Sequence, residues 1–192
     1  MSLNDDVLVI NIRSGDVFTD RKLPLHQRKF GQPPCSYYKE VIRMHSWSDV
    51  IFTSENNDNP CVNNVLNMIN KKFQKSSLIH DLSYLLNAKN LVVSRGKIGF
   101  ALVLIRLKIF FMFNRSVSRL PQHLNCVPTD DYYEDVIRHW ANTTYQRNLM
   151  LNSKCLSWEY VKNDPNNFFL QGNFIKCVLK LYVIKLIVCL FA

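Results

Sequence analysis

The 192-residue chain has little glycine and proline, 5 and 7 residues, and no segment of low complexity. This composition excludes a collagen-like chain, and no regular repeat indicates a solenoid. The six cysteines lie far apart, with no C-x-x-C pair and no histidine at the spacing of a zinc site, so we expect no bound metal. Hydrophobic residues make up 47% of the chain and charged residues 20%, which is typical of a globular domain with a packed core.

The chain also lacks any run of like charges, although 24 basic and 15 acidic residues give it a formal net charge of +9. The basic residues occur in ones and twos, and no aromatic residues alternate with them. Nucleic-acid-binding domains carry clustered cations, so we expect no nucleic-acid partner. Most of the basic residues are then surface side chains, and a few could line an anion-binding cleft.

Neither end of the chain carries a clear targeting or membrane signal. The first six residues lead directly into the apolar run Val7–Ile10, without the regions of a secretory signal peptide. Residues 174–192 are apolar except for three lysines, whereas a spanning helix needs about 20 mostly apolar residues. We expect this segment not to span a membrane. The alternatives for it are a core element, a tail outside the fold and a C-terminal anchor.

Two N-glycosylation sequons, Asn114-Arg-Ser116 and Asn142-Thr-Thr144, favour a protein of the secretory pathway. Glycosylated sequons would lie on surface loops. The cysteines could form disulfides in that compartment, although their spacing does not show which of them pair.

Short apolar runs alternate with segments of helical period along residues 7–113. The runs predict strands, and the periodic segments predict helices, of which two begin at Pro33-Pro34 and Asn59-Pro60 and a third is capped by Asp81. Such alternation is typical of a parallel sheet with helices on both faces. The predicted strands are residues 7–12, 49–53, 77–79, 91–94 and 109–113, and the last helix of this region is residues 98–107.

Beyond residue 114 the pattern changes to a connection that contains proline and asparagine. Helical spacing then predicts two C-terminal helices, at Tyr132–Trp140 and near Leu156–Val161. The predicted fold class is therefore α/β, with a Rossmann-like parallel sheet and added C-terminal helices. We assign residues 5–162 to this domain and leave residues 163–192 as an apolar tail.

Candidate binding residues follow two of the predicted strands. In an open α/β sheet, ligands bind at the carboxyl ends of the strands. The first strand is followed by Arg13, a forked donor for phosphate oxygens, and by Gly15, which permits a tight turn. The fourth is followed by Ser94 and Gly96 among basic residues, next to a predicted helix start that would favour an anion. Neither segment matches a P-loop or dinucleotide motif. The alternative is that these are turn residues and a surface arginine.

The order of four segments resembles a known family. VINIRSGD, QPPCSYYKEVI, TSENNDNP and DLSYLLNAKNLVVSRGKIG resemble the nucleotide-sugar-binding half of fucosyltransferase-like glycosyltransferases, which carry a His-x-Arg-x-Gly-Asp motif and a later Ser-x-Gly-Thr/Ser-Phe motif. The resemblance spans about residues 7–113 and extends toward residue 161. It implies one lobe of a two-lobed, metal-independent enzyme without a cofactor. It also implies a GDP-sugar donor such as GDP-fucose, a glycan or protein acceptor, and a location in the Golgi or secretory lumen.

Roles for individual residues follow from the same resemblance. It implies that Arg13 contacts the β-phosphate of the donor and that Ser94 and Gly96 lie beside the diphosphate. Gly15 and Asp16 would hold the turn after the first strand. A guanidinium and a helix N-terminus would then take the place of a divalent cation as the diphosphate leaves.

The nucleoside would be met by acidic residues, which the resemblance places at Glu55 and Asp81. The chain departs from the family at Asn11, where the family has histidine, and at Lys97 and Ile98, where it has a hydroxyl residue and phenylalanine. Because the first predicted strand begins at residue 7, we expect these 192 residues to lack the lobe that precedes this strand in the family. No catalytic residue is assigned. Two interpretations stay open: a glycosyltransferase, and an inactive remnant or interaction domain of the same fold.

Overall fold

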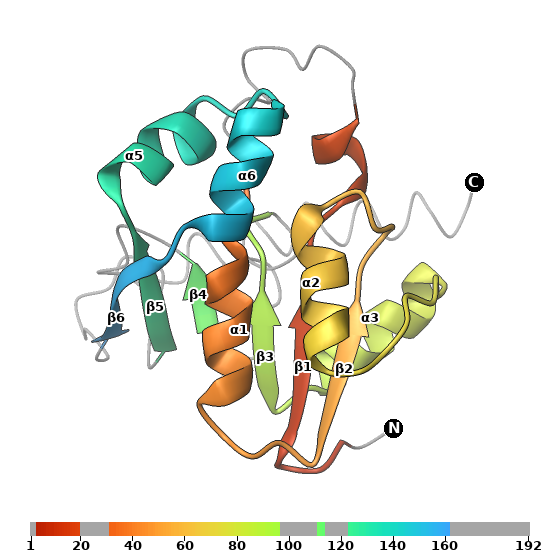
Figure 1. Cartoon of the computed structure of the whole chain (residues 1–192). Coiled ribbons are helices and arrows are strands. Elements are labelled where there is room, and N and C mark those ends of the chain that lie inside the picture. Colours follow the sequence, from red (N-terminus) through yellow and green to blue (C-terminus); the bar gives the residue numbers. More distant parts are fainter. Residues whose placement is uncertain (1–2, 20–30, 97–110, 114–122, 162–192) are drawn as a thin grey trace, which may run out of the picture.

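The computed structural model describes residues 3–19, 31–96, 111–113 and 123–161 (Figure 1). Three sequence predictions lie outside the described residues: the helix at residues 98–107, the sequon at Asn114 and the apolar tail from residue 163. The described part forms a sheet with helices on both of its faces, so the chain is α/β, as predicted.

The sheet has six strands in the order β2-β1-β3-β4-β5-β6. The first five run parallel to one another, in agreement with the predicted parallel sheet, and β6 adds an antiparallel strand at one edge. Leu8, Val9 and Ile10 of the inner strand β1 are fully buried, as is typical of a parallel strand covered on both faces. The strands are β1 (Val7–Asn11), β2 (Asp49–Thr53), β3 (Asn90–Val93), β4 (Phe111–Phe113), β5 (His123–Pro128) and β6 (Cys155–Val161).

The sheet separates two hydrophobic clusters, one under the helices on each of its faces. Helices α1 (Cys35–Arg43) and α2 (Pro60–Met68) cover the front face of the sheet, and α3 (Leu78–Asn87) covers the back (Figure 1). Leu8 and Ile10 pack with the front helices, whereas Val9 packs with the back one. This alternation follows from the period of two residues in a strand. The C-terminal region adds α5 (Asp130–Tyr132), the π-helix η2 (Tyr133–Arg138) and α6 (Thr144–Asn152).

The predicted starts of the first two long helices are confirmed. Helix α1 begins directly after Pro34, and Pro60 is the first residue of α2. The Asn59 side chain caps α2 by accepting a hydrogen bond from the backbone N–H of Cys61. Val62, Val65 and Leu66, which recur at helical spacing along α2, are buried.

The predicted strand at residues 77–79 is wrong, and so is the cap at Asp81. Ser77 is the N-cap of α3, and its hydroxyl accepts from the backbone N–H of His80. Leu78 and Ile79 lie in the first turn of the helix and are exposed, at 66% and 81%. A run of three apolar residues fits a strand or a helix equally well, and here the serine cap decides between them.

Two C-terminal predictions also need correction. Residues 156–161 belong to strand β6 and not to a helix, because they pair with β5, a strand that the sequence analysis missed. Helix α6 was missed as well, although Thr143 and Gln146 form a capping box at its start. The segment Tyr132–Trp140 is helical over most of its length, as predicted, and Trp140 is fully buried.

Two disulfides join these elements. Cys35–Cys61 links the first turns of α1 and α2, with a Cα–Cα distance of 5.0 Å, and Cys126–Cys155 links β5 to β6. Disulfides are compatible with a secreted or lumenal protein. Within the described part of the chain, no helix has the length and apolar character needed to cross a membrane.

Candidate functional site

The carboxyl ends of three neighbouring strands meet at one edge of the sheet. Strand β1 lies between β2 and β3, and backbone hydrogen bonds continue the pairing past the strand ends: Ile12 N–H donates to Thr53 O over 3.0 Å, and Ser94 N–H donates to Asn11 O over 3.0 Å. The Ser94 hydroxyl then accepts from the backbone N–H of Arg13 over 2.6 Å. Arg13 and Ser94, 81 residues apart in the sequence, are therefore adjacent, because the parallel strands that precede them are neighbours in the sheet.

The guanidinium of Arg13 lies over the end of β3. A Cβ atom placed on Gly96 would be 3.1 Å from Nη1, so the missing side chain at this position leaves room for the arginine. On the other side, Nη2 is 3.3 Å from both carboxylate oxygens of Asp16. The Arg13 side chain is 24% exposed and that of Asp16 is 72% exposed. The Arg13 side chain is thus largely enclosed, and it is paired with a carboxylate that solvent or a ligand can reach.

Glu55 adds a second carboxylate to this edge. Gly15 has a φ of +65°, and its ideal Cβ position lies 2.0 Å from Glu55 Oε2, so the carboxylate packs against the glycine backbone. Burial raises the pKa of the Glu55 carboxyl group, and the charge of Asp16 raises it further, while Arg13 opposes the shift. The cluster therefore holds a guanidinium suited to an anion and two carboxylates suited to hydroxyl or N–H donors.

The sequence analysis missed the residues that hold the turn after β1. Asn56 Oδ1 accepts from the Ser14 hydroxyl and from the Gly15 N–H, the latter over 3.1 Å. Asn59 contacts the same turn from the start of α2. The asparagine-rich stretch after β2 could have indicated these contacts from the sequence, because asparagine side chains bond readily to nearby backbone groups. Since Asn56 occupies the Gly15 N–H, this backbone group is not available to a ligand in the arrangement described.

Two further polar residues at this edge, Asn11 and Arg95, donate hydrogen bonds to other parts of the chain. Asn11 stands where the family that the sequence resembles has histidine, and its Nδ2 donates to Thr53 Oγ1 over 3.1 Å. Arg95 donates from Nη1 to the carbonyl of Ile137 in η2 over 3.1 Å, and burial lowers the pKa of its guanidinium. Arg95 therefore ties β3 to the C-terminal region.

Two tyrosines of α1 lie beneath the end of β3. The Tyr37 hydroxyl donates to Val93 O over 3.3 Å, and both Tyr37 and Tyr38 are fully buried. Burial raises the pKa of each phenol. These side chains are therefore neutral, and they pack below the site.

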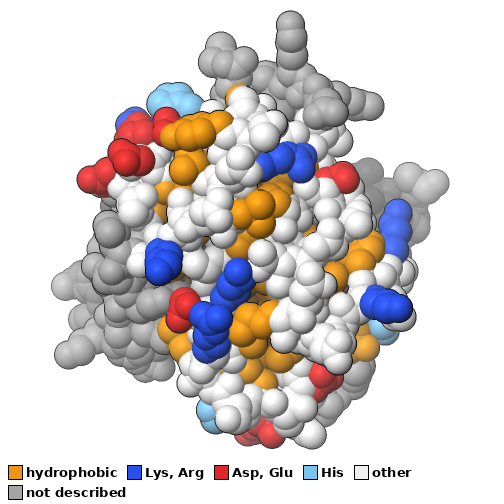
Figure 2. Space-filling model, in the orientation of Figure 1, with side chains coloured by type: hydrophobic (Ala, Val, Ile, Leu, Met, Phe, Trp, Pro, Cys, Tyr) orange, Lys and Arg blue, Asp and Glu red, His pale blue; other side chains and the backbone are white. Residues whose placement is uncertain are grey.

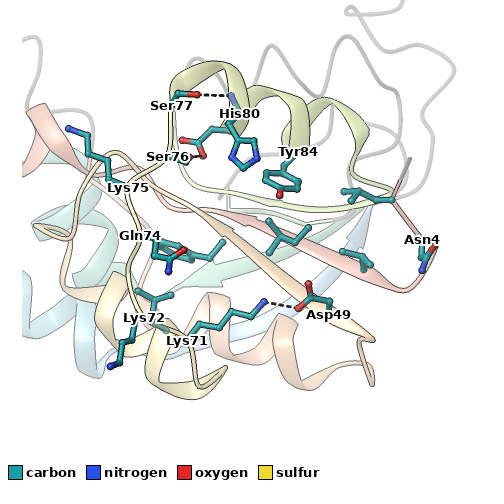
Figure 3. Close-up of a pocket in the computed structure, with 16 residues that line it drawn as sticks. Asn4, Asp49, Lys71, Lys72, Gln74, Lys75, Ser76, Ser77, His80 and Tyr84 are labelled. Carbon is teal, nitrogen blue, oxygen red and sulfur yellow. Dashed lines mark hydrogen bonds and ion pairs between the residues drawn. The ribbon is translucent and has the colours of Figure 1, made fainter. Parts of the chain in front are cut away.

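Asp81 does not join the cluster around Arg13. It lies in the first turn of α3, accepts a hydrogen bond from the Ser76 hydroxyl, and lines a separate groove of about 890 Å³ beside β2 (Figure 3). His80 and Tyr84 point from α3 toward this groove. Across it, Lys71 Nζ pairs with Asp49 Oδ1 over 2.6 Å. Of the residues that the resemblance implies, the structure leaves Asp81 apart and brings six together: Arg13, Gly15, Asp16, Glu55, Ser94 and Gly96.

Charged side chains and possible metal ligands can be compared with this cluster over the described part of the chain. On the face covered by α1 and α2, lysine and arginine side chains lie in separate small groups (Figure 2). Among the residues that the structure describes, no group of three or more His, Cys, Asp or Glu side chains is placed to hold a metal ion. No family model, curated protein or solved structure matches the chain.

Proposed function

We propose that this chain is the nucleotide-sugar-binding lobe of a fucosyltransferase-like glycosyltransferase with a Rossmann-like fold, and that it binds a GDP-sugar such as GDP-fucose without a metal. The observation that carries the proposal is the Arg13 guanidinium, held at the carboxyl ends of β1 and β3 between Asp16 and Gly96. The order of the sequence motifs supports the choice of nucleotide-sugar, because it joins this arginine to Ser94 in the pattern of that family.

The proposed chemistry rests on electrostatics. A diphosphate at this edge would compete with Asp16 for the guanidinium, since phosphate accepts two parallel N–H bonds from arginine as a carboxylate does. As the sugar–phosphate bond breaks, negative charge grows on the diphosphate, and a cation that is already in place stabilises it. Glu55 would accept hydrogen bonds from hydroxyl or N–H groups of the nucleoside. The sugar would pass to a glycan or protein acceptor in the Golgi or secretory lumen.

The test is isothermal titration calorimetry with GDP and GDP-fucose in the presence of EDTA. We expect binding by the wild-type chain and a loss of about 10- to 100-fold in affinity for Arg13→Ala, since a hydrogen bond to a charged group contributes about 1.5–3 kcal/mol. The matched control is Arg43→Ala, which removes an exposed arginine on α1 that pairs with Glu40. Absence of GDP binding, or equal affinity in Arg13→Ala and wild type, would refute the proposal.

A second candidate is an inactive remnant or interaction domain that retains the fold. The observation in its favour is Asn11, whose neutral amide is bonded to Thr53 and cannot carry a proton where the family has histidine. Release of GDP from GDP-fucose, measured with mixed glycan acceptors, distinguishes the two. Steady turnover that Arg13→Ala abolishes excludes the remnant, whereas binding without turnover favours it.

A further inference from the structure

Asn59 uses each of its hydrogen-bonding groups to join α2 to the turn after β1. It is fully buried, and its Oδ1 accepts from the Cys61 N–H over 2.9 Å. Its Nδ2 donates to the carbonyl of Arg13 over 2.8 Å, and its backbone N–H donates to the Ser14 hydroxyl over 2.9 Å. One side chain thus caps a helix and holds the backbone of the residue that carries the guanidinium.

The cap alone does not require asparagine. Serine, aspartate and asparagine cap helices about equally well, because capping needs only a side-chain oxygen. Of these three, only asparagine has a terminal NH2 group that can donate while its oxygen caps the helix, because ionised aspartate has no donor and serine has a single, shorter hydroxyl. The bond to Arg13 is therefore a separate contribution of Asn59 that a serine in the same place would lose.

This bond holds the backbone of Arg13 from a second side. The Arg13 N–H donates to Ser94 Oγ over 2.6 Å, and the Arg13 carbonyl accepts from Asn59, so β3 holds one side of the residue and α2 holds the other. The anchor on α2 is itself fixed, because Cys61 is joined to Cys35 of α1 and both cysteines are fully buried. A residue fixed before binding loses less conformational entropy when a ligand binds.

We propose that Asn59 is a positioning residue, which fixes the Arg13 backbone so that the guanidinium is preorganised for an anionic ligand at the carboxyl end of β1. This inference rests on the proposed function for its ligand, GDP. Its structural part, the restraint on the turn at residues 13–16, is measurable without any ligand.

The test compares Asn59→Ser with Asn63→Ser, a matched change on the exposed side of the same helix. Serine keeps the cap of α2 and removes the donor to Arg13. We expect Asn59→Ser to bind GDP about 5- to 10-fold more weakly than wild type and to exchange its backbone amides at residues 14–16 about 10-fold faster, with unchanged protection in β1 and α2. Asn63→Ser should match the wild type in both measurements.

Two results would overturn the inference: wild-type GDP affinity together with wild-type exchange at residues 14–16, or exchange that rises uniformly over the whole chain. If the wild-type chain does not bind GDP, the proposed function fails. Faster exchange confined to residues 14–16 would then still support the positioning role, and unchanged exchange would overturn it. If Asn59→Ser does not fold, Asn59→Asp replaces it, because an aspartate cap is favoured by the helix dipole and also lacks the donor at neutral pH.

Discussion

Gly31 lies where the segment before α1 passes the backbone of η2, and replacing it with alanine is the sharpest test of the packing around the site. A Cβ atom at this position would lie 1.8 Å from the carbonyl oxygen of Val136 and 2.9 Å from Cα of Ile137. Carbon–oxygen contacts in proteins are about 3.3 Å or longer, so the two backbones would have to separate by roughly 1.5 Å. Both obstacles are backbone atoms, and no side-chain rotation relieves the clash.

The cost follows from the neighbouring contacts. Overpacking a buried position costs about 1–3 kcal/mol. Moving η2 also weakens the hydrogen bond from Arg95 to Ile137, and a bond to a charged group contributes about 1.5–3 kcal/mol. The lower entropy of an alanine-containing unfolded chain offsets about 0.4–1 kcal/mol. We expect Gly31→Ala to lose about 3 kcal/mol of stability, which for a chain of this length lowers the melting midpoint by about 6–12 °C.

The assay is thermal unfolding followed by circular dichroism, with Gly96→Ala as the matched control. A Cβ atom at Gly96 meets the end of the Arg13 side chain at 3.1 Å, and a flexible side chain can move aside. Gly31→Ala should also weaken GDP binding, because the adjacent Gln32 donates from Nε2 to the Arg95 carbonyl at the end of β3. The reasoning is refuted if Gly31→Ala melts within 1 °C of wild type, or no lower than Gly96→Ala.

Three other substitutions test single contacts. Trp140→Phe removes the indole N–H that donates to Val17 O over 2.8 Å, and the free energy of unfolding in urea should fall by about 1–3 kcal/mol; an unchanged value contradicts this. Because burial raises the pKa of Glu55, its ionisation destabilises the fold, so Glu55→Gln should melt higher than wild type at pH 7 and equally below about pH 4. Because Lys71 lowers the pKa of Asp49, Asp49→Asn should melt lower at pH 7, with a difference that disappears as the pH falls below about 3.9. Shifts of the opposite sign would show that these charges are not placed as described.

The raised and lowered carboxyl pKa values have distinct physical origins. Glu55 lies against Gly15 and near Asp16, where desolvation and a like charge both disfavour its ionised form. Asp49 instead accepts a hydrogen bond from Lys71 and another from the N–H of Val50, and both favour its ionised form. Within the proposed function, the raised pKa of Glu55 makes donor binding depend on pH.

The parts of the fold that the sequence predicted well are those with local signals. The continuous apolar run Val7–Ile10 predicted the inner strand β1, and Asn59-Pro60 predicted the start of α2 from a cap and a fixed φ. Strand β6 was missed, because it exists through its antiparallel pairing with β5 and not through its own pattern. The short run at residues 77–79 was misread for a similar reason, since its length fits either a strand or a helix.

The same division applies to the candidate site. That Arg13 and Ser94 lie at the same edge of the sheet could be predicted from the sequence, because both follow strands of a parallel sheet. The contact of Glu55 with Gly15 and the approach of Arg13 to Gly96 could not, since they depend on the paths of side chains from three strands.

The sequence by itself determined the α/β class, the starts of the first two helices and the placing of a guanidinium after the first strand, because each of these depends on residues near one another in the chain. Tertiary structure alone decided which groups surround that guanidinium. Asn59 reaches the Arg13 carbonyl across 46 residues of sequence, and the pairing of Cys35 with Cys61 fixes the helix that carries it. Such contacts are set by the packing of α1 and α2 on the sheet, and no local pattern encodes their distances.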